Sequence, residues 1–388
     1  MAHLDEPVIP NQLTLHRLGP TICVVVALVV SACAPARPPR VAPLPATPGL
    51  PLMLTWLGEF TRPAAAVYPS LSDSVRFGSL SGLALDLKSG QWIGAIDDRE
   101  GTRVAWLTIE FAGGQLRVSP SRMMALTPGP GVADRVARES DLEAIAALPD
   151  GTFLMSEEGH VRDGEWWQPV ILHVSRAGVV LSVTPYPPAF SITADPARGL
   201  RDNQGFESLT VTPRGRVIAG LEQPLKEDDE PTSFTHAGAG RLIAFEQNGD
   251  RWQPGPEWRY MISATPRIEG FPQICSDGEN GLVDLLALSE TTLVAMERAC
   301  LMDTAGEHSA NAVQLFTVEL AGREARKRPL LDLSALVPKL SPALARLENF
   351  EALSFGPTLP DGTRTLLVVS DDNFRATQKT AFLLFGMK

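Results

Sequence analysis

The chain of 388 residues is 44% hydrophobic and 20% charged, a composition typical of a globular protein with a large core. Its formal net charge is −11, and its densest basic run is confined to residues 323–329, so the sequence disfavours a nucleic-acid partner. The 32 glycines and 33 prolines, without a long amphipathic helical pattern, indicate an all-β fold with many turns.

The N-terminal segment is typical of an export signal. Nine apolar residues, Ile22–Val30, follow Arg17, and this run is too short to cross a bilayer as a helix. It ends in Val-Ser-Ala-Cys, which resembles the bacterial lipobox, in which the cysteine is lipidated after cleavage. We therefore expect residues 1–32 to be a lipoprotein signal peptide and Cys33 to be a lipid anchor. A cleaved secretory signal and a buried apolar strand are the alternatives.

Residues 33–51 are rich in proline and alanine, which predicts an extended tether between the anchor and a domain at 52–388. The identity of Ala34 favours delivery to the outer membrane. The sequence thus predicts a bacterial envelope protein that faces the periplasm and touches the membrane only through Cys33.

Two cysteines remain outside the predicted signal, Cys275 and Cys300. An exported protein folds in an oxidising compartment, where disulfides persist. A turn at Ser289–Thr291 between two apolar runs would bring the two cysteines together at the open end of a hairpin. We expect a disulfide between them, with two free thiols as the alternative.

Five related segments follow one another along the chain, each with an apolar strand, a turn and a second strand that ends in acidic residues. Their first strands lie at 81–87, 141–148, 205–211, 281–288 and 349–355. A second hairpin follows in the first four segments, and the fifth has a third strand at 380–387 and then ends. A strand at 53–61 would supply its missing fourth.

This pattern predicts a β-propeller of about five four-stranded blades, with six blades as the alternative, closed by an N-terminal strand that completes the last blade. The rival folds are a β-sandwich and a pair of barrels. Neither would repeat an acidic residue at the start of the same strand of each unit.

The repeated acidic residues would meet at one mouth of the propeller tunnel. The first strand of each unit is the expected inner strand, and the second returns antiparallel to the same rim. The inner strands would contribute Glu143, Glu207, Asp284 and Glu351 near their starts, and the second strands would end in Asp97, Glu157, Glu222, Glu297 and Asp371.

Crowded carboxylates repel one another unless a cation neutralises them. Arg298, Arg201 and Arg99 are too few to do so, which favours Ca²⁺, a cation that oxygen ligands bind. The predicted metal ligands are Glu143, Glu207, Glu222, Asp284, Glu297, Glu351 and Asp371. The alternative is a structural role, in which strand-end acids accept backbone N–H groups and hold neighbouring blades together.

Four phrases resemble the bacterial "esterase-like activity of phytase" family, the phytase-like domains. They are DLEAIAALPDGTFLMSEE, NQGFESLTVTPRGRVIAGLEQPL, GLVDLLALSETTLVAMER and NFEALSFGP with LLVVSDDN, and they spread over most of the chain beyond Ser81. The family is grouped with β-propeller phytases, which are Ca²⁺-dependent phosphomonoesterases. The resemblance implies an acidic, Ca²⁺-filled face that receives a phosphate.

The candidate catalytic residues are Glu157, Arg298 and His160, with Arg298 to orient an anionic substrate and His160 as a possible general base. No nucleophile elbow, zinc spacing or glycine-rich phosphate loop is present in the sequence. Two hypotheses stay open. The first is a metal-dependent hydrolase of a small anionic ester or phosphoester. The second is a non-catalytic envelope propeller that binds a ligand, glycan or protein.

Overall fold

The computed structural model describes residues 51–64, 76–98, 101–249, 251–276 and 278–388, all within the compact unit Pro39–Lys388. The predicted signal peptide, the Cys33 anchor and all but the last residue of the predicted tether lie outside these residues. Among the described residues, no helix is long and apolar enough to cross a membrane. The helices are short, namely α1 (Asp134–Arg138) and the 3-10 helices η1 (Pro188–Phe190), η2 (Leu333–Lys339) and η3 (Pro342–Leu344).

Strands dominate the described chain and form blades of four main antiparallel strands each, numbered here from the inner strand outward. Blade 1 contains β2 (Leu80–Asp86), β3 (Gln91–Ile96), β4 (Arg103–Ala112) and β5 (Gln115–Ala125). Blade 2 contains β7 (Leu142–Ala147), β8 (Phe153–Glu157), β11 (Val170–Val174) and β12 (Val179–Pro185). Blade 3 contains β13 (Phe206–Val211), β14 (Val217–Leu221), β15 (Gly238–Asn248) and β16 (Arg251–Ile262).

Blade 4 contains β18 (Gly281–Ala287), β19 (Thr292–Met302), β20 (Ser309–Ala321) and β21 (Glu324–Asp332). Blade 5 contains β22 (Asn349–Phe355), β23 (Thr365–Asp371), β24 (Lys379–Met387) and β1 (Leu54–Pro63). Short strands extend or bridge the blades, namely β6 (Thr127–Pro128) beside β12, β17 (Gln273–Ile274) beside β19, and the hairpin of β9 (His160–Arg162) and β10 (Glu165–Trp167).

The inner strands contact one another in a closed circle. Strand β2 lies against β7 and β22, β13 lies against β7 and β18, and β18 lies against β22. Gly82 permits one close approach, because a Cβ there would lie 2.7 Å from the backbone nitrogen of Ile145 in the next blade. The prediction of a β-propeller is confirmed, and the described residues form five blades rather than six.

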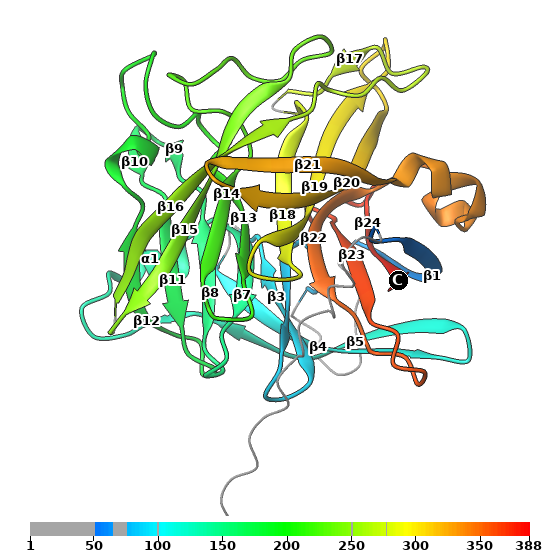
Figure 1. Cartoon of the computed structure of the whole chain (residues 1–388), viewed down its shortest axis with the longest axis horizontal. Coiled ribbons are helices and arrows are strands. Elements are labelled where there is room, and N and C mark those ends of the chain that lie inside the picture. The colour runs from blue at the N-terminus through cyan, green and yellow to red at the C-terminus, as the bar shows by residue number, and fades with distance from the viewer. Residues whose placement is uncertain (1–50, 65–75, 99–100, 250, 277) are drawn as a thin grey trace, which may run out of the picture. The chain divides into compact units, whose positions relative to one another are not determined.

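The first described strand closes the ring, as predicted. Strand β1 pairs antiparallel with β24 from Leu54 opposite Met387 to Pro63 opposite Lys379. Figure 1 shows the blue β1 beside the red β24. This pairing covers the edge of the last blade, which would otherwise expose unpaired backbone groups.

Apolar side chains fill the space between each pair of neighbouring blades. Trp106 of blade 1 meets Phe153 of blade 2 edge-on, with ring centroids 6.3 Å apart. Similar clusters join blades 2 and 3, 3 and 4, 4 and 5, and 5 and 1. The innermost strands are therefore held from both sides, and the side chains at their ends occupy defined positions.

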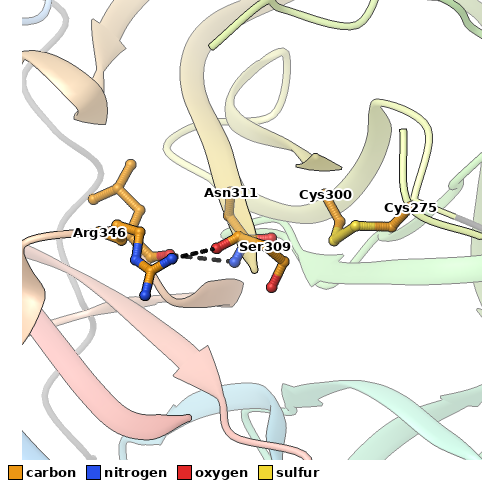
Figure 2. Close-up of a disulfide and its surroundings, with 6 residues drawn as sticks. Cys275, Cys300, Ser309, Asn311 and Arg346 are labelled. Atoms are coloured by element: carbon orange, nitrogen blue, oxygen red, sulfur yellow. Dashed lines mark hydrogen bonds between the residues drawn. A yellow bond between two sulfur atoms is a disulfide. The ribbon is translucent and has the colours of Figure 1, made fainter. Parts of the chain in front are cut away.

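The predicted disulfide is confirmed. Cys275, directly after β17, and Cys300 of β19 are bonded with their Cα atoms 5.4 Å apart (Figure 2). The Cys275 N–H also donates to the Cys300 carbonyl at 3.0 Å. On β20, Asn311 donates to the carbonyl of Leu347, on the segment that leads into blade 5. The disulfide thus fastens Cys275, in the segment between β16 and β18, to β19 of blade 4.

Replacing Cys275→Ser and Cys300→Ser together should lower the free energy of unfolding by about 3 kcal/mol, because the bond closes a loop of 25 residues. Urea unfolding of the oxidised protein measures the change. Dithiothreitol should bring the native protein to the level of the double variant and leave that variant unaffected. Equal unfolding midpoints before and after reduction would contradict this expectation.

Candidate functional site

A bulge near the start of each inner strand sets the geometry of the rim. In every inner strand the pairing register skips one residue, so one extra residue faces the gap between two paired positions. A bulge of this kind bends the strand and redirects the side chain that it carries. The extra residues, in blade order, are Ser81, Glu143, Glu207, Val283 and Glu351.

Three predicted glutamates therefore do occupy equivalent positions, but Asp284 does not. Val283 is the bulge residue of blade 4, and the alignment that placed Asp284 with the glutamates is off by one residue. The Asp284 carboxylate accepts the N–H of Leu285 at 2.7 Å and the N–H of Leu353 in blade 5. Asp284 thus joins two neighbouring blades, which is the structural role that the sequence left open as the alternative.

The second strands contribute one further residue per blade, the one that follows the partner of the residue before the bulge. These positions hold Asp97, Glu158, Glu222, Arg298 and Asp371. In blades 2 and 4 the sequence alignment was again one residue off, because it chose Glu157 and Glu297. A cation, Arg298, stands in blade 4 where the other four blades have an acid.

Glu297 is held by groups from blades 3 and 4. Its carboxylate accepts the hydroxyl of Tyr260 at 2.7 Å, the N–H of Ser263 at 3.0 Å and the side-chain amide of Asn280 at 2.9 Å. Lys327 of β21 is its ion-pair partner. These contacts match the structural role of a strand-end acid and leave Glu297 outside the groups of ligand atoms described next.

Five acidic side chains, which we call the carboxylate cluster, form two overlapping groups of possible ligands. One oxygen each from Asp97, Asp141 and Glu143 lie within 4.8 Å of one another, and so do oxygens of Glu143, Glu158 and Glu207. Glu143 belongs to both groups. Of the five, Asp141, Glu143, Glu158 and Glu207 are buried and Asp97 is partly buried.

Burial and mutual repulsion shape the charge of the cluster. Burial raises the pKa of Glu143, and the neighbouring charges of Glu207 and Glu158 raise it further. The pKa of Glu158 is raised by burial and by Asp141 and Glu222, and that of Glu207 by burial and by Glu222 and Glu158. Close carboxylates with raised pKa values fit a hard cation, which oxygen ligands coordinate and whose charge would relieve the repulsion.

Arg298 lies on the other side of the mouth and forms an ion pair with Glu351. Burial alone would lower its pKa, but the carboxylates of Glu351, Glu222 and Glu207 together raise it above its ordinary value. Its Nε has no hydrogen-bond partner among the described residues. Burial and the charge of Glu351 raise the pKa of Asp371, which accepts the N–H of Asn373 at 2.6 Å.

Of the other predicted residues, Glu157 and His160 lie beside the carboxylate cluster. Glu157 and His160 are buried beside Asp141, with His160 Nδ1 3.4 Å from Glu157 Oε1. Arg201 donates to the carbonyl of Asp229 at 2.7 Å, and Arg99 lies outside the described residues.

Sequence reasoning missed Asp141 and Glu158 as members of the cluster. Glu158 lies one residue beyond Glu157, the last paired residue of β8. Aligning the blades by the pairing of their strands would have identified it.

Two surface hollows lie elsewhere. One of about 660 Å³ lies at the opposite ends of the inner strands, and its Glu290 already binds Thr212 and the N–H of Arg214. The other, of about 910 Å³, lies along the outer strands β15, β16 and β21. Neither includes a member of the carboxylate cluster, so the mouth remains the candidate site on chemical grounds.

Comparison with protein families identifies this chain. The family described as "Phytase-like: Esterase-like activity of phytase" matches residues 75–374. The chain belongs to the phytase-like family. The match covers all five inner strands and every member of the carboxylate cluster of this phytase-like protein. A comparison with curated proteins gave no match.

Solved structures resemble this phytase-like chain only distantly. An endo-arabinase from Bacteroides thetaiotaomicron is 11% identical, with 84% of this chain and 96% of that chain covered and a TM-score of 0.43. A gluconolactonase from Xanthomonas campestris is 10% identical, with 88% and 98% covered and a TM-score of 0.32. The catalytic domain of a Coprinopsis cinerea α-L-arabinofuranosidase is 11% identical, with 85% and 97% covered and a TM-score of 0.39. Similarity at this level carries no conclusion about activity.

The raised pKa values predict how pH affects the metal-free protein. When folding raises the pKa of a carboxyl group, the folded protein keeps a proton that the unfolded chain has already released. The free energy of unfolding therefore falls as pH rises from the pKa of the unfolded chain to the higher pKa of the folded protein. Thermal unfolding of the metal-free protein should therefore occur at a higher temperature at about pH 5 than at about pH 7. Glu143→Gln should raise the metal-free Tm at neutral pH by about 2 °C or more and weaken this pH dependence.

Calorimetry with and without a chelator measures both effects. Glu110→Gln, a change at an exposed glutamate of β4, is the matched control and should behave as the native protein. A lower metal-free Tm in Glu143→Gln would show that this carboxylate stabilises the fold and would contradict the cation site.

Proposed function

We propose that this phytase-like protein is a metal-dependent hydrolase that acts on a phosphoester or other anionic ester at the carboxylate cluster. The observation that carries the proposal is the pair of ligand groups that share Glu143, on the same rim as the buried Arg298. The family description, esterase-like activity of phytase, supports the same class of reaction. Ca²⁺ is the proposed ion, because the cluster offers only carboxylate oxygens.

The charges of the rim indicate how such a substrate would bind. Five acidic side chains would repel an anionic ester, so a bound cation is required before it can approach. Asp97, Asp141, Glu143, Glu158 and Glu207 would hold the ion or ions. A bound metal ion supplies Lewis acidity toward the ester oxygens and lowers the pKa of a coordinated water.

Arg298 would orient the anion from the opposite side. Its Nε–H is without a partner among the described residues and can donate to a phosphate or carboxylate oxygen. Its ion pair with Glu351 fixes the direction of the guanidinium group. A planar guanidinium with its position fixed by a carboxylate can bind an oxyanion in one orientation, which a lysine cannot reproduce.

Hydrolysis of p-nitrophenyl phosphate and of phytate, measured with and without Ca²⁺, tests the proposal. Turnover should require the metal, and kcat/KM should fall at least about 100-fold in Glu143→Gln because one residue of both ligand groups is changed. Arg298→Lys should raise KM about tenfold with a smaller effect on kcat. Glu110→Gln is the control and should keep native kinetics.

Stabilisation by Ca²⁺ without turnover of any phosphoester or carboxylic ester, with any divalent metal, would contradict the hydrolase. The protein would then fit the second hypothesis, a non-catalytic envelope propeller that binds a ligand through this mouth.

We further propose that the protein is a lipoprotein of the bacterial envelope, held in the outer membrane through Cys33 and facing the periplasm. The lipobox-like sequence at 30–33 and the proline-rich residues after it support this location.

Expression of Cys33→Ala in a bacterial host should move most of the protein from the membrane fraction to the soluble fraction, because a lipid anchor would be lost. Labelling with a radioactive fatty acid should disappear in the same variant. Ser31→Thr, which keeps the cysteine, serves as the control. Retention of Cys33→Ala in the membrane fraction would exclude the anchor.

A further inference from the structure

A buried polar network adjoins Arg298 at the junction of blades 3 and 4. Its centre is Glu297, which is fully buried and opposes Leu282 of the inner strand. The equivalent positions of blades 1 and 3 hold Ile96 and Leu221, which are also buried. The propeller therefore accepts an apolar side chain at this point of a blade, and packing alone does not explain the glutamate of blade 4.

The counter-charge of this network is Lys327 of β21. Its ammonium group lies over the rings of Phe316 and Tyr260, 4.3 and 5.0 Å from their centroids. It also donates to the Ser263 hydroxyl at 2.7 Å. A buried ion pair is often no more stabilising than apolar side chains of the same volume, because both charges lose their hydration. The pair of Glu297 and Lys327 therefore calls for a role beyond stability.

Asn280 carries the network across to blade 3. It is fully buried, and its side-chain amide donates to Glu297 at 2.9 Å and to the Ser263 carbonyl at 3.0 Å. Its own main-chain carbonyl accepts the side-chain amide of Gln223 at 3.0 Å. Gln223 directly follows Glu222, the residue with which the second strand of blade 3 reaches the rim.

The same junction is tightly packed. Gly281 follows Asn280 and is the Cα partner of Arg298. A Cβ at Gly281 would lie 2.4 Å from the Cγ atom of Glu222, so the glutamate side chain lies directly against this backbone. The network thus fixes the chain on both sides of the gap between Glu222 and Arg298.

We propose that this network positions the Arg298 guanidinium to bind an anionic substrate. Its positioning residues are Glu297, Lys327 and Asn280. The inference rests on the proposed function, in which Arg298 binds the anion. Glu351 of blade 5 holds the tip of the arginine side chain, and the network holds the backbone at its base. An arginine side chain has several rotatable bonds, so a shift at its base would let the guanidinium turn away from the substrate.

An apolar replacement of the network tests the proposal. Glu297→Leu, Lys327→Met and Tyr260→Phe together conserve side-chain volume, so this triple variant should keep the native midpoint of urea unfolding. KM for p-nitrophenyl phosphate at saturating Ca²⁺ should nevertheless rise about tenfold, with kcat changed less than about twofold. In an Arg298→Lys background the same three changes should add almost nothing to KM, because the network acts through the arginine.

A second measurement does not depend on turnover. In protein labelled with ¹⁵N-arginine, the Nε–H resonance of Arg298 is identified by its loss in Arg298→Lys. This resonance should shift or broaden in the triple variant. Asp86→Asn with Arg176→Met is the matched control, because it removes the ion pair of a buried carboxylate at the opposite end of an inner strand. The control should leave KM and the Arg298 resonance unaltered.

Tyr260→Phe alone decides if the triple variant does not fold, since it removes a single hydroxyl from Glu297. It should shift the Arg298 resonance and raise KM about threefold. An unchanged Arg298 resonance in a folded variant would overturn the positioning role, and so would KM effects that add in full in the Arg298→Lys background. A shifted resonance without any turnover by the native protein would contradict the hydrolase and still support the positioning of Arg298.

Discussion

Repulsion among buried carboxylates at one rim of the propeller is the constraint on which the rest of the site depends. Glu143, Glu158 and Glu207 come from two neighbouring blades; Glu207 and Glu158 raise the pKa of Glu143, and Glu158 also raises the pKa of Glu207. In a poorly solvated site such groups must either hold protons or bind a cation. The apolar packing between blades keeps the side chains from separating, so the fold itself creates the demand for positive charge.

Blade 4 differs from its neighbours in a way that gives the rim a direction. It has Val283 at the bulge of its inner strand and Arg298 at the end position of its second strand. Blades 2 and 3 have glutamates at both of these positions. The acidic groups that can hold metal therefore gather on one side, and the cation stands on the other. In the proposed hydrolase, an anionic group between them would meet the bound cation on one side and the Arg298 guanidinium on the other, so that charge developing on it would be stabilised from both sides.

The sequence was sufficient for the architecture because each blade repeats the same order of strand, turn and acidic strand end. The identities of the site residues were harder to predict, and the errors were by one residue. A bulge adds a residue to the inner strand without altering its apolar pattern, so Asp284 was aligned with Glu143 although Val283 is its counterpart. The β9–β10 hairpin was overlooked although Asp163 and Gly164 form a recognisable turn signal. Whether Asp141 points toward its neighbours depends on packing between blades, which no local pattern records.

The pairing of β1 with β24 has a consequence for how the chain matures. Strand β1 finds its partner only when β24, up to Met387, has also emerged from the ribosome. Blade 5 must then wait until β24 has been synthesised, and contacts so distant along the chain form slowly. Until that moment the ring is open and its terminal edge is unprotected. A chain truncated near its C-terminus would leave β1 without a partner, as a ready template for association with other strands.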